Sequence, residues 1–216
     1  MLLVNIKNIS LKRNEKSSII LSNVNFITNR GERLVILGRN GSGKTTLLKA
    51  VADLLDDSFI IDGVVSLDGT EYLNLKQQER VNFRREKIGV IFQDPFSSLD
   101  PLKKLGYYMK FVPDQEIFNL YLEKLGFEHS KKTENLLPYE LSTGMAQKFQ
   151  IALNFAMDKE IYLLDEPTSA LDSISINKLN ELLVEVENSE KIIITVTQDK
   201  GFAHKFSANF LTISLC

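Results

Sequence analysis

The sequence has little of several residue types, and each scarcity excludes a class of protein. Its one cysteine, Cys216, cannot form a disulfide within the chain, and nothing beside it suggests a catalytic thiol. No run of residues approaches the ~18 apolar positions of a membrane-spanning helix. The first ten residues lack the basic segment and the longer apolar stretch of a secretory signal. We therefore expect the chain to stay in the cytosol, where it can dock on a membrane protein.

An excess of positive charge is also missing. Lys and Arg number 26 against 28 Asp and Glu, a formal net charge of −2, so the composition predicts no nucleic-acid partner. The 216 residues are 44% hydrophobic and 25% charged. Because single cores stop growing near ~250 to 300 residues, this length suits one α/β domain with a small insertion. No internal repeat, low-complexity tract or Pro/Gly-rich linker marks a second domain.

The most informative segment is a phosphate-binding loop at residues 38–46. It reads Gly-Arg-Asn-Gly-Ser-Gly-Lys-Thr-Thr and directly follows the apolar run 34–37. Its glycines let the backbone come close to a polyphosphate, and a helix behind it would point unpaired N–H groups at the anion. Lys44 is expected at the β- and γ-phosphates, and the Thr45 hydroxyl on Mg²⁺. The alternative is a glycine-rich turn that matches by chance. The expected nucleotide contacts are Gly38, Arg39, Asn40, Gly41, Ser42, Gly43, Lys44, Thr45 and Thr46.

Two acidic residues follow a second apolar run, at 161–164. Such a run is typical of a buried parallel strand, and this one ends in Asp165 and Glu166. Ligands of parallel α/β sheets bind at the carboxyl ends of strands, so this pair is expected beside the phosphate loop. Asp165 would hold Mg²⁺ through its water shell, and Glu166 would act as general base on the attacking water. Taken alone, such a pair is more often a solvated strand end; behind a phosphate loop the hydrolytic interpretation is favoured.

Hydrophobic periodicity predicts an α/β fold in three regions. Alternation at 3–11, 24–28 and 63–69 indicates an antiparallel β subdomain. A parallel core is indicated by apolar strands at 34–37, 88–92, 161–164 and 192–196, a last strand at 207–215, and helices at about 44–55 and 174–187. Between Gln93 and Asp158 the pattern becomes helical, at 114–124 and 144–157.

From about residue 3 to 215 the chain resembles the nucleotide-binding subunit of an ABC transporter. Four motifs beyond the phosphate loop occur in the family's order: a Q-loop at 92–95, a signature-like Leu-Ser-Thr-Gly-Met at 141–145, the Walker B strand ending in Asp165 and Glu166, and a D-loop at 169–172. The extended Q-loop at 92–101, and Leu-Pro-Tyr-Glu at 137–140 before a signature ending in Met, are similar to the oligopeptide, dipeptide and nickel importer subfamily.

The resemblance implies a P-loop NTPase (RecA-like) parallel core with an N-terminal antiparallel β subdomain and an inserted helical subdomain. Residues 1–216 would form a single ABC ATPase domain. Its nucleotide-binding core with the β subdomain would comprise 1–93 and 159–216, and its helical subdomain 94–158. The chain would lie at the cytoplasmic face of the cell membrane, with the helical subdomain against an integral membrane permease.

The resemblance also implies a site shared between two ABC ATPase subunits stacked head to tail. ATP and Mg²⁺ would lie between the phosphate loop of one subunit and the signature of the other. The catalytic set would be Lys44, Gln93, Glu166 and Gln198; the Mg²⁺ set would be Thr45, Gln93 and Asp165. Ser142, Gly144 and Met145 would face the ATP of the partner subunit. Gln93 would also report nucleotide state to the helical subdomain.

Three positions depart from the family pattern. Thr143 replaces the first signature glycine; its stiff β-branched side chain either alters the N–H geometry there or is tolerated. Gln198 stands in place of the switch histidine, and an amide can bond γ-phosphate but cannot carry charge. No aromatic residue occurs from Met1 to Asn25 to stack on adenine, so Arg13 or Lys12 is expected to serve.

Three functions remain open. The favoured one is an ATP-hydrolysing subunit that powers import of a peptide, nickel or a metal chelate through a separate permease. The alternatives are a soluble ABC ATPase without a transport role, and a degenerate regulatory cassette paired with a more active paralogue, which Thr143 and Gln198 suggest. Whether the second subunit is an identical chain or a paralogue is left open.

Overall fold

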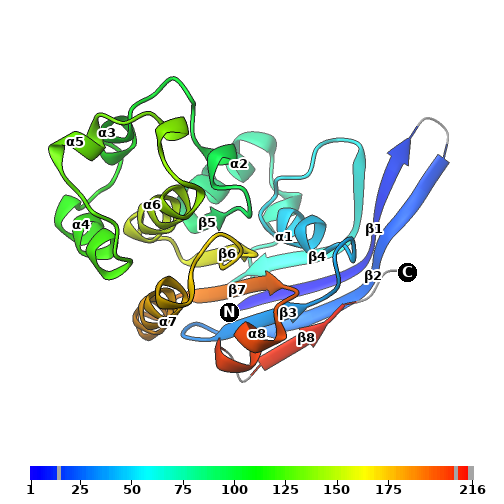
Figure 1. The fold of residues 1–216 in the computed structure, drawn as a ribbon. Helices are drawn as coiled ribbons and strands as arrows, with labels where there is room; N and C mark the ends of the chain where they lie inside the picture. The colour runs from blue at the N-terminus through cyan, green and yellow to red at the C-terminus, as the bar shows by residue number, and fades with distance from the viewer. Residues whose placement is uncertain (14–15, 207–208, 214–216) are drawn as a thin grey trace.

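The computed structural model describes residues 1–13, 16–206 and 209–213, and this part of the chain forms two sheets (Figure 1). The antiparallel sheet has the order β2-β1-β4, with β1 at Leu2–Arg13, β2 at Lys16–Thr28 and β4 at Phe59–Leu67. The parallel sheet has the order β5-β6-β7-β3-β8. Its strands are β3 (Arg33–Leu37), β5 (Ile88–Ile91), β6 (Ile161–Asp165), β7 (Ile192–Thr197) and β8 (Asn209–Thr212).

Strand β2 begins eight residues before the predicted segment at 24–28. The cause is a bulge, because Ile9 pairs with Leu21 while Ser10 pairs with Ile19, which leaves Ile20 as an extra residue on β2. The extra residue interrupts the period-two alternation that marks a half-buried strand. The prediction therefore missed the first half of β2.

The parallel sheet separates two hydrophobic clusters. Along β6, Ile161 and Leu163 pack with the β subdomain and α1 (Lys44–Val51), whereas Tyr162 and Leu164 pack with the helices of the other face. Successive side chains of a strand point to opposite faces, so a strand buried on both faces needs an uninterrupted apolar run. This is the pattern from which the strand was predicted.

Helix α1 ends four residues earlier than the predicted range 44–55. Asp53 turns the chain with a left-handed φ of 55°, a conformation that usually ends a helix at glycine. The Asp53 carboxylate is buried and accepts a 3.1 Å hydrogen bond from Arg80 Nε, which compensates for the backbone angle. An aspartate at this position does not indicate the end of a helix in the way that a glycine does, so the sequence did not predict where α1 ends.

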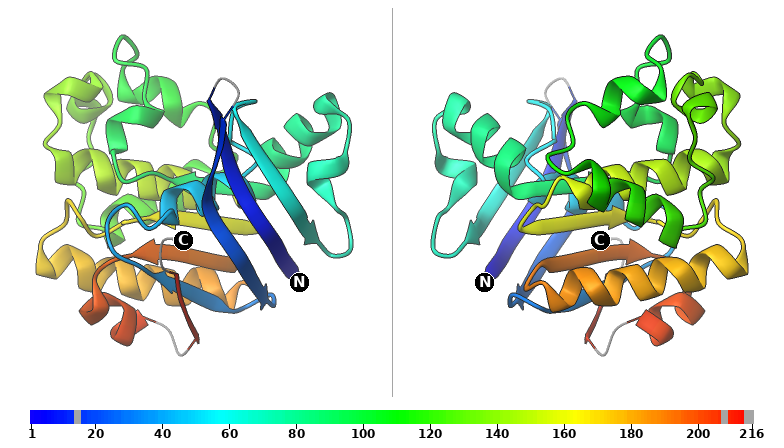
Figure 2. Two further views of the ribbon diagram at one scale, coloured as in Figure 1. Left: turned by 90° about the vertical axis from the view of Figure 1, so that its right-hand side faces the viewer. Right: turned by 90° about the vertical axis from the view of Figure 1, so that its left-hand side faces the viewer.

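Helices gather at one end of the molecule, away from the antiparallel sheet (Figure 2). They are α3 (Leu105–Met109), α4 (Gln115–Lys124), α5 (Lys131–Glu134) and α6 (Thr143–Ala156), with short 3-10 turns η2 (Pro95–Ser98) and η3 (Pro138–Glu140). Both helices predicted in this segment are present, as α4 and α6. The proposed boundaries at 94 and 158 stay a prediction.

The remaining elements are η1 (Tyr72–Asn74), α2 (Gln77–Lys87), α7 (Ser173–Asn188) and α8 (Lys200–Phe206). Helix α2 was not predicted, because none of its residues is buried and it therefore has no apolar face. Within the ranges described, no helix is both long and apolar enough to span a membrane.

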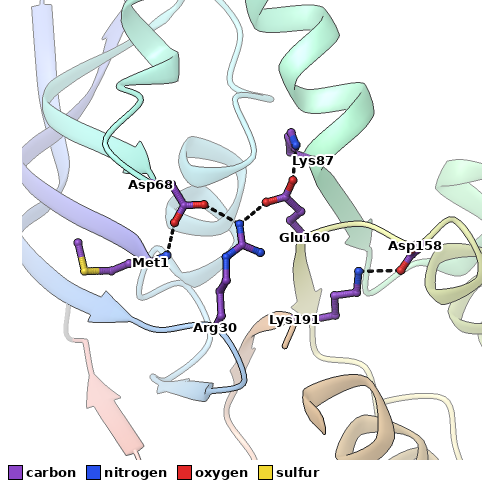
Figure 3. Close-up of polar contacts among 7 residues, drawn as sticks. All are labelled: Met1, Arg30, Asp68, Lys87, Asp158, Glu160 and Lys191. Atoms are coloured by element: carbon purple, nitrogen blue, oxygen red, sulfur yellow. Dashed lines mark hydrogen bonds and ion pairs between the residues drawn. The ribbon is translucent and has the colours of Figure 1, made fainter. Parts of the chain in front are cut away.

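An ionic network joins the β subdomain to the parallel core (Figure 3). The Arg30 guanidinium, between β2 and β3, lies 2.5 Å from Asp68 and 2.5 Å from Glu160. Asp68 follows β4 and also pairs with the amine of Met1, while Glu160 precedes β6 and also pairs with Lys87. This network lies at the amino end of β6, opposite the end where the predicted site residues emerge.

Candidate functional site

The predicted site residues meet at the carboxyl edge of the parallel sheet. A pocket of about 380 Å³ opens there beside the phosphate loop. Its lining consists of Ile20, Asn40, Gly41, Gly43, Lys44, Thr45, Thr46, Gln93, Asp165 and Glu166. Strands β3 and β6 are not adjacent in the sheet, yet both run parallel to β7, so their ends deliver these groups to one place.

Close packing explains why glycine occupies position 43. Gly43 precedes α1 with a φ of 85°, and a Cβ added there would lie 2.7 Å from Leu21 Cγ on β2. Any side chain would meet both a backbone penalty and a clash. The β subdomain is thus packed directly on the phosphate loop. Ile20, which was not among the predicted site residues, lines the pocket from the same strand.

Lys44 is almost completely buried at the centre of the site. Its Nζ donates to the carbonyl oxygens of Gly38, at 3.0 Å, and Arg39, at 3.1 Å, and lies 3.5 Å from Glu166 Oε1. These contacts fix an ammonium inside the curl of the loop. The Lys44 ammonium would therefore lie next to a polyphosphate bound in the loop without having to move.

Thr45 and Asp165 form the second contact between the loop and β6. The Thr45 hydroxyl donates a 2.7 Å hydrogen bond to Asp165 Oδ2, while Oδ1 of the same carboxylate is buried without a hydrogen-bond partner in the described residues. Burial raises the pKa of Asp165, and the neighbouring charge of Glu166 adds to this, although the bond from Thr45 acts in the opposite direction. A buried carboxylate oxygen without a donor is the environment in which a cation is a favourable neighbour.

Glu166 is held in a strained backbone conformation, with a left-handed φ of 45°. Its carboxylate accepts a 2.7 Å hydrogen bond from the Thr197 hydroxyl and a 2.9 Å hydrogen bond from the backbone N–H of Gln198. Strain of this kind persists only where the surroundings determine the conformation. Thr197, which immediately precedes the predicted switch position, was not among the predicted site residues.

The side chain of Gln198 is exposed and lines a neighbouring cavity of about 730 Å³ with Gly38, Arg39, Asn40 and Ser42. Asn40 borders both cavities, so they adjoin across the phosphate loop. Gln198 therefore contacts the Glu166 carboxylate through its backbone N–H, while it lines the cavity on the other side of the phosphate loop.

The signature-like residues do not line the phosphate pocket of their own chain. Ser142 caps α6, accepting a 3.2 Å hydrogen bond from the Met145 amide, and Gly144 packs so that an added Cβ would lie 3.0 Å from the Ala170 carbonyl oxygen. Thr143 is the first residue of α6 and has no left-handed backbone angle. The threonine thus adopts ordinary helical geometry, and its effect on the nucleotide of a facing subunit stays a prediction. Arg13 ends β1, but its side chain lies outside the described residues.

Comparison with known proteins assigns the chain to a family. The model of the ABC transporter family matches residues 21–169. The chain belongs to that family. An oligopeptide transport ATP-binding protein of Lactococcus lactis is 35% identical over 185 residues, which are 80% of this chain and 54% of that protein. A metal-staphylopine import system ATP-binding protein of Staphylococcus aureus is 29% identical, over 87% of this chain and 73% of that protein. The chain thus spans about half the length of the first of these relatives.

Solved structures agree with this assignment. A dimeric ATP-binding cassette in a post-hydrolysis state, bound to ADP and phosphate, superposes with a TM-score of 0.84 at 27% identity and covers 99% of this chain and 94% of that one. The predicted α/β P-loop NTPase fold and the resemblance to ABC ATPases of the peptide importer subfamily are therefore confirmed. As a member of this family the chain is an ATP-binding ABC ATPase domain.

Proposed function

We propose that this chain is the ATP-binding and ATP-hydrolysing subunit of an importer for a peptide, nickel or a metal chelate. The observation that carries the proposal is the convergence of Lys44, Thr45, Asp165 and Glu166 in one pocket at the carboxyl ends of β3 and β6. Relatives named for oligopeptide, trimethylamine N-oxide and metal-staphylopine transport support the import assignment.

Mg²⁺ fits the residues present. The orphaned Oδ1 of Asp165 and the Thr45 hydroxyl, hydrogen-bonded to the same carboxylate, are hard oxygen donors of the kind that Mg²⁺ prefers. Gln93 lines the same pocket with a neutral amide oxygen. When bound with ATP, the ion would neutralise charge that develops on the phosphate oxygens. Asp165 is assigned to hold its water shell.

Glu166 is assigned as general base. Its backbone strain and the bonds from Thr197 and Gln198 orient the carboxylate toward the pocket, and Lys44 lies near enough to stabilise its charge. With phosphates in the loop, Lys44 would bind the β- and γ-oxygens, and Glu166 would take a proton from the attacking water. Gln93 would orient that water or the ion, and Gln198 would bond γ-phosphate from the adjoining cavity.

The site is proposed to be completed by a second ABC ATPase subunit. Ser142, Gly144 and Met145 stand at the N-terminal end of a 14-residue helix, exposed or half-exposed and outside their own phosphate pocket. N-terminal amides and the helix dipole stabilise an anion, so this end suits the γ-phosphate of a facing subunit. The dimeric structures of related cassettes support this arrangement.

The chain is further proposed to act at the cytoplasmic face of the membrane, with its helical subdomain against a separate permease. Thr143 does not support the alternative of a degenerate regulatory cassette, because it begins α6 without backbone strain. The alternative of an ABC ATPase without a transport role finds no support in the transport names of the relatives.

The test of the catalytic assignment is Glu166→Gln. ATP binding should persist while turnover falls by ~10² to 10⁴-fold, the usual contribution of a positioned general base. Glu181→Gln, an exposed glutamate on α7, is the matched control and should leave both unchanged. Hydrolysis at the wild-type rate in Glu166→Gln would refute the assignment.

The transport assignment needs the membrane partner. The tagged chain should isolate integral membrane permease subunits, and the reconstituted complex should import a labelled oligopeptide or Ni²⁺ with ATP but not with a non-hydrolysable analogue. A complex that isolates no permease, or one that hydrolyses ATP without moving either solute class, would favour a role other than import of these solutes.

A further inference from the structure

A buried glutamine joins the Q-loop to the signature helix. Gln150 lies on α6 with its side chain fully buried. Its amide orientation is assigned from the surrounding hydrogen-bond network. In that orientation Nε2 donates to the Phe92 carbonyl oxygen at 3.2 Å, and Oε1 accepts from the Phe92 amide at 3.2 Å and from the Ser98 hydroxyl at 2.9 Å. Every hydrogen-bonding atom of the amide then has a partner.

The bonds to Phe92 copy those of a neighbouring strand. Phe92 directly follows β5, which is an edge strand of the parallel sheet. An edge strand leaves backbone groups unpaired on its open side, and here one side-chain amide meets both the N–H and the C=O of a single residue. Gln150 thus substitutes for a strand at the point where the chain leaves the sheet.

The same side-chain amide of Gln150 bonds residues at both ends of the Q-loop. Phe92 and Ser98 bracket the segment that contains Gln93 and η2, and Gln150 contacts both ends of it. Gln93 itself lines the phosphate pocket. The backbone position of the residue next to the nucleotide therefore depends on a bond to α6.

Helix α6 also carries the groups assigned to the facing subunit's ATP. Ser142 caps its N-terminus, eight residues before Gln150, which corresponds to about 12 Å along an α-helix. The first turn packs against the D-loop, where a Cβ on Gly144 would come within 3.0 Å of the Ala170 carbonyl oxygen. A rigid helix therefore runs from the signature to the Q-loop.

We infer that Gln150 is a positioning residue for ATP hydrolysis. It fixes the position of Gln93, which lies at this chain's own nucleotide, relative to α6. The N-terminal end of α6 in turn contacts the nucleotide of the facing subunit. The inference rests on the proposed function, in which Gln93 contacts the attacking water or the metal ion. Gln150 touches neither phosphate nor ion; it acts through the backbone of Phe92.

The test is Gln150→Met in the purified chain, which keeps the side-chain length and removes all three hydrogen bonds. We expect kcat for ATP to fall about tenfold, with the affinity for a fluorescent ATP analogue changed less than about twofold. Backbone amide hydrogen exchange at 92–98 should accelerate about tenfold or more, because these amides lose their tether. Asn154→Ala is the matched control, since within the described part of the chain the side-chain amide of Asn154 donates to the Gln150 carbonyl oxygen alone, at 3.0 Å. It should leave all three quantities unchanged.

A double-mutant cycle separates the inference from the proposed function. If Gln150 acts through Gln93, Gln150→Met should lower kcat no further in a Gln93→Ala background. If Gln93→Ala lowers kcat while Gln150→Met does not, or if the two effects multiply, the inference is overturned and the proposed function stands. If Gln93→Ala leaves kcat at the wild-type value, the proposed role of Gln93 fails, and with it the inference.

Ser98→Ala keeps the inference testable if Gln150→Met does not fold. Ser98 is exposed, and its truncation removes the 2.9 Å bond to Gln150 together with a 3.2 Å contact between its hydroxyl and the Pro95 carbonyl oxygen. We expect the same direction of change in kcat and in exchange at 92–98, but a smaller one. Wild-type values for both would overturn the inference.

Discussion

The Thr197 hydroxyl donates a 2.7 Å hydrogen bond to Glu166 Oε2 across two adjacent strands of the parallel sheet. The same hydroxyl accepts a 3.0 Å bond from the Asp199 amide, so its proton is directed at the carboxylate. A threonine at the end of β7 thus fixes the orientation of the proposed general base.

Thr197→Val should slow hydrolysis without weakening nucleotide binding. A hydrogen bond to a charged group contributes roughly 1.5–3 kcal/mol, so its loss from a positioned base predicts a ten- to hundredfold fall in rate. Single-turnover hydrolysis and titration with a fluorescent ATP analogue measure the two quantities. Thr195→Val, two residues earlier on the same strand and also buried, should leave both unchanged. An equal loss of rate in the control would mean that the strand, not the hydroxyl, is responsible.

Asp165→Asn should make the nucleotide-free protein more stable while it abolishes Mg²⁺-dependent hydrolysis. Burial raises the pKa of Asp165, so its contribution to stability is present at low pH and is lost as pH rises through the folded-state pKa. The stability gained by the variant should therefore be larger at pH 7.5 than at pH 4. A gain of about 1 kcal/mol corresponds to roughly 2–4 °C in Tm for a domain of this size.

Thermal denaturation at the two pH values tests this prediction. Asp62→Asn, which alters an exposed carboxylate on β4, is the control and should shift Tm little at either pH. A variant at position 165 that is less stable than wild type at pH 7.5 would show that the bond from Thr45 outweighs the burial of the charge.

That most residues of the candidate site would meet in one pocket could be predicted because their positions have local backbone requirements. Gly43 must accept a φ of 85°, Lys44 and Thr45 must follow it on a helix, and Asp165 must end a buried strand directly before Glu166. Such requirements appear as fixed spacings in a sequence. The parallel strands were predictable for the same reason, since burial on both faces demands uninterrupted apolar runs.

What could not be predicted depends on partners that are distant in the chain. Gln150 and Ser98 are 52 residues apart. No sequence pattern predicts that a buried glutamine will form hydrogen bonds with the end of an edge strand. Ile20 was missed because a bulge conceals its strand, and the helix at 77–87 because it buries no residue. These features arise from tertiary packing, which overrides local pattern.

Arg30 should contribute modestly and in a pH-dependent way to the contact between the β subdomain and the core (Figure 3). Hydrogen bonds from the Met1 amine and then from Arg30 lower the pKa of Asp68. Burial alone would raise the pKa of Glu160, but bonds from Lys87 and Arg30 outweigh it and lower the value. Both carboxylates therefore stabilise the fold above their unfolded-state pKa values, and this contribution is lost as pH falls through the folded-state values.

Arg30→Met should lower the free energy of unfolding by about 1 kcal/mol or less near pH 7, because the groups are partly exposed to solvent. The difference from wild type should shrink at pH 3 and in 1 M salt, and urea denaturation measures it. Lys124→Met, which removes a single exposed pair with Glu185, is the control and should change stability less. A difference that does not depend on pH would mean that the aliphatic part of Arg30, not its charge, stabilises the contact.

The same substitution should have opposite effects on stability at two buried glutamines one turn apart on α6. Gln147 and Gln150 are both fully buried, but neither amide atom of Gln147 has a hydrogen-bond partner among the described residues. A buried polar group without a partner destabilises by about 1–3 kcal/mol, so Gln147→Met should raise Tm by several degrees. Gln150→Met should lower Tm, because it leaves the N–H and C=O of Phe92 without their partner. Thermal denaturation of both variants in one buffer is the measurement. If Gln147→Met is the more destabilising of the two, the Gln147 amide has a partner in solution, and its burial has to be explained as part of a hydrogen-bond network.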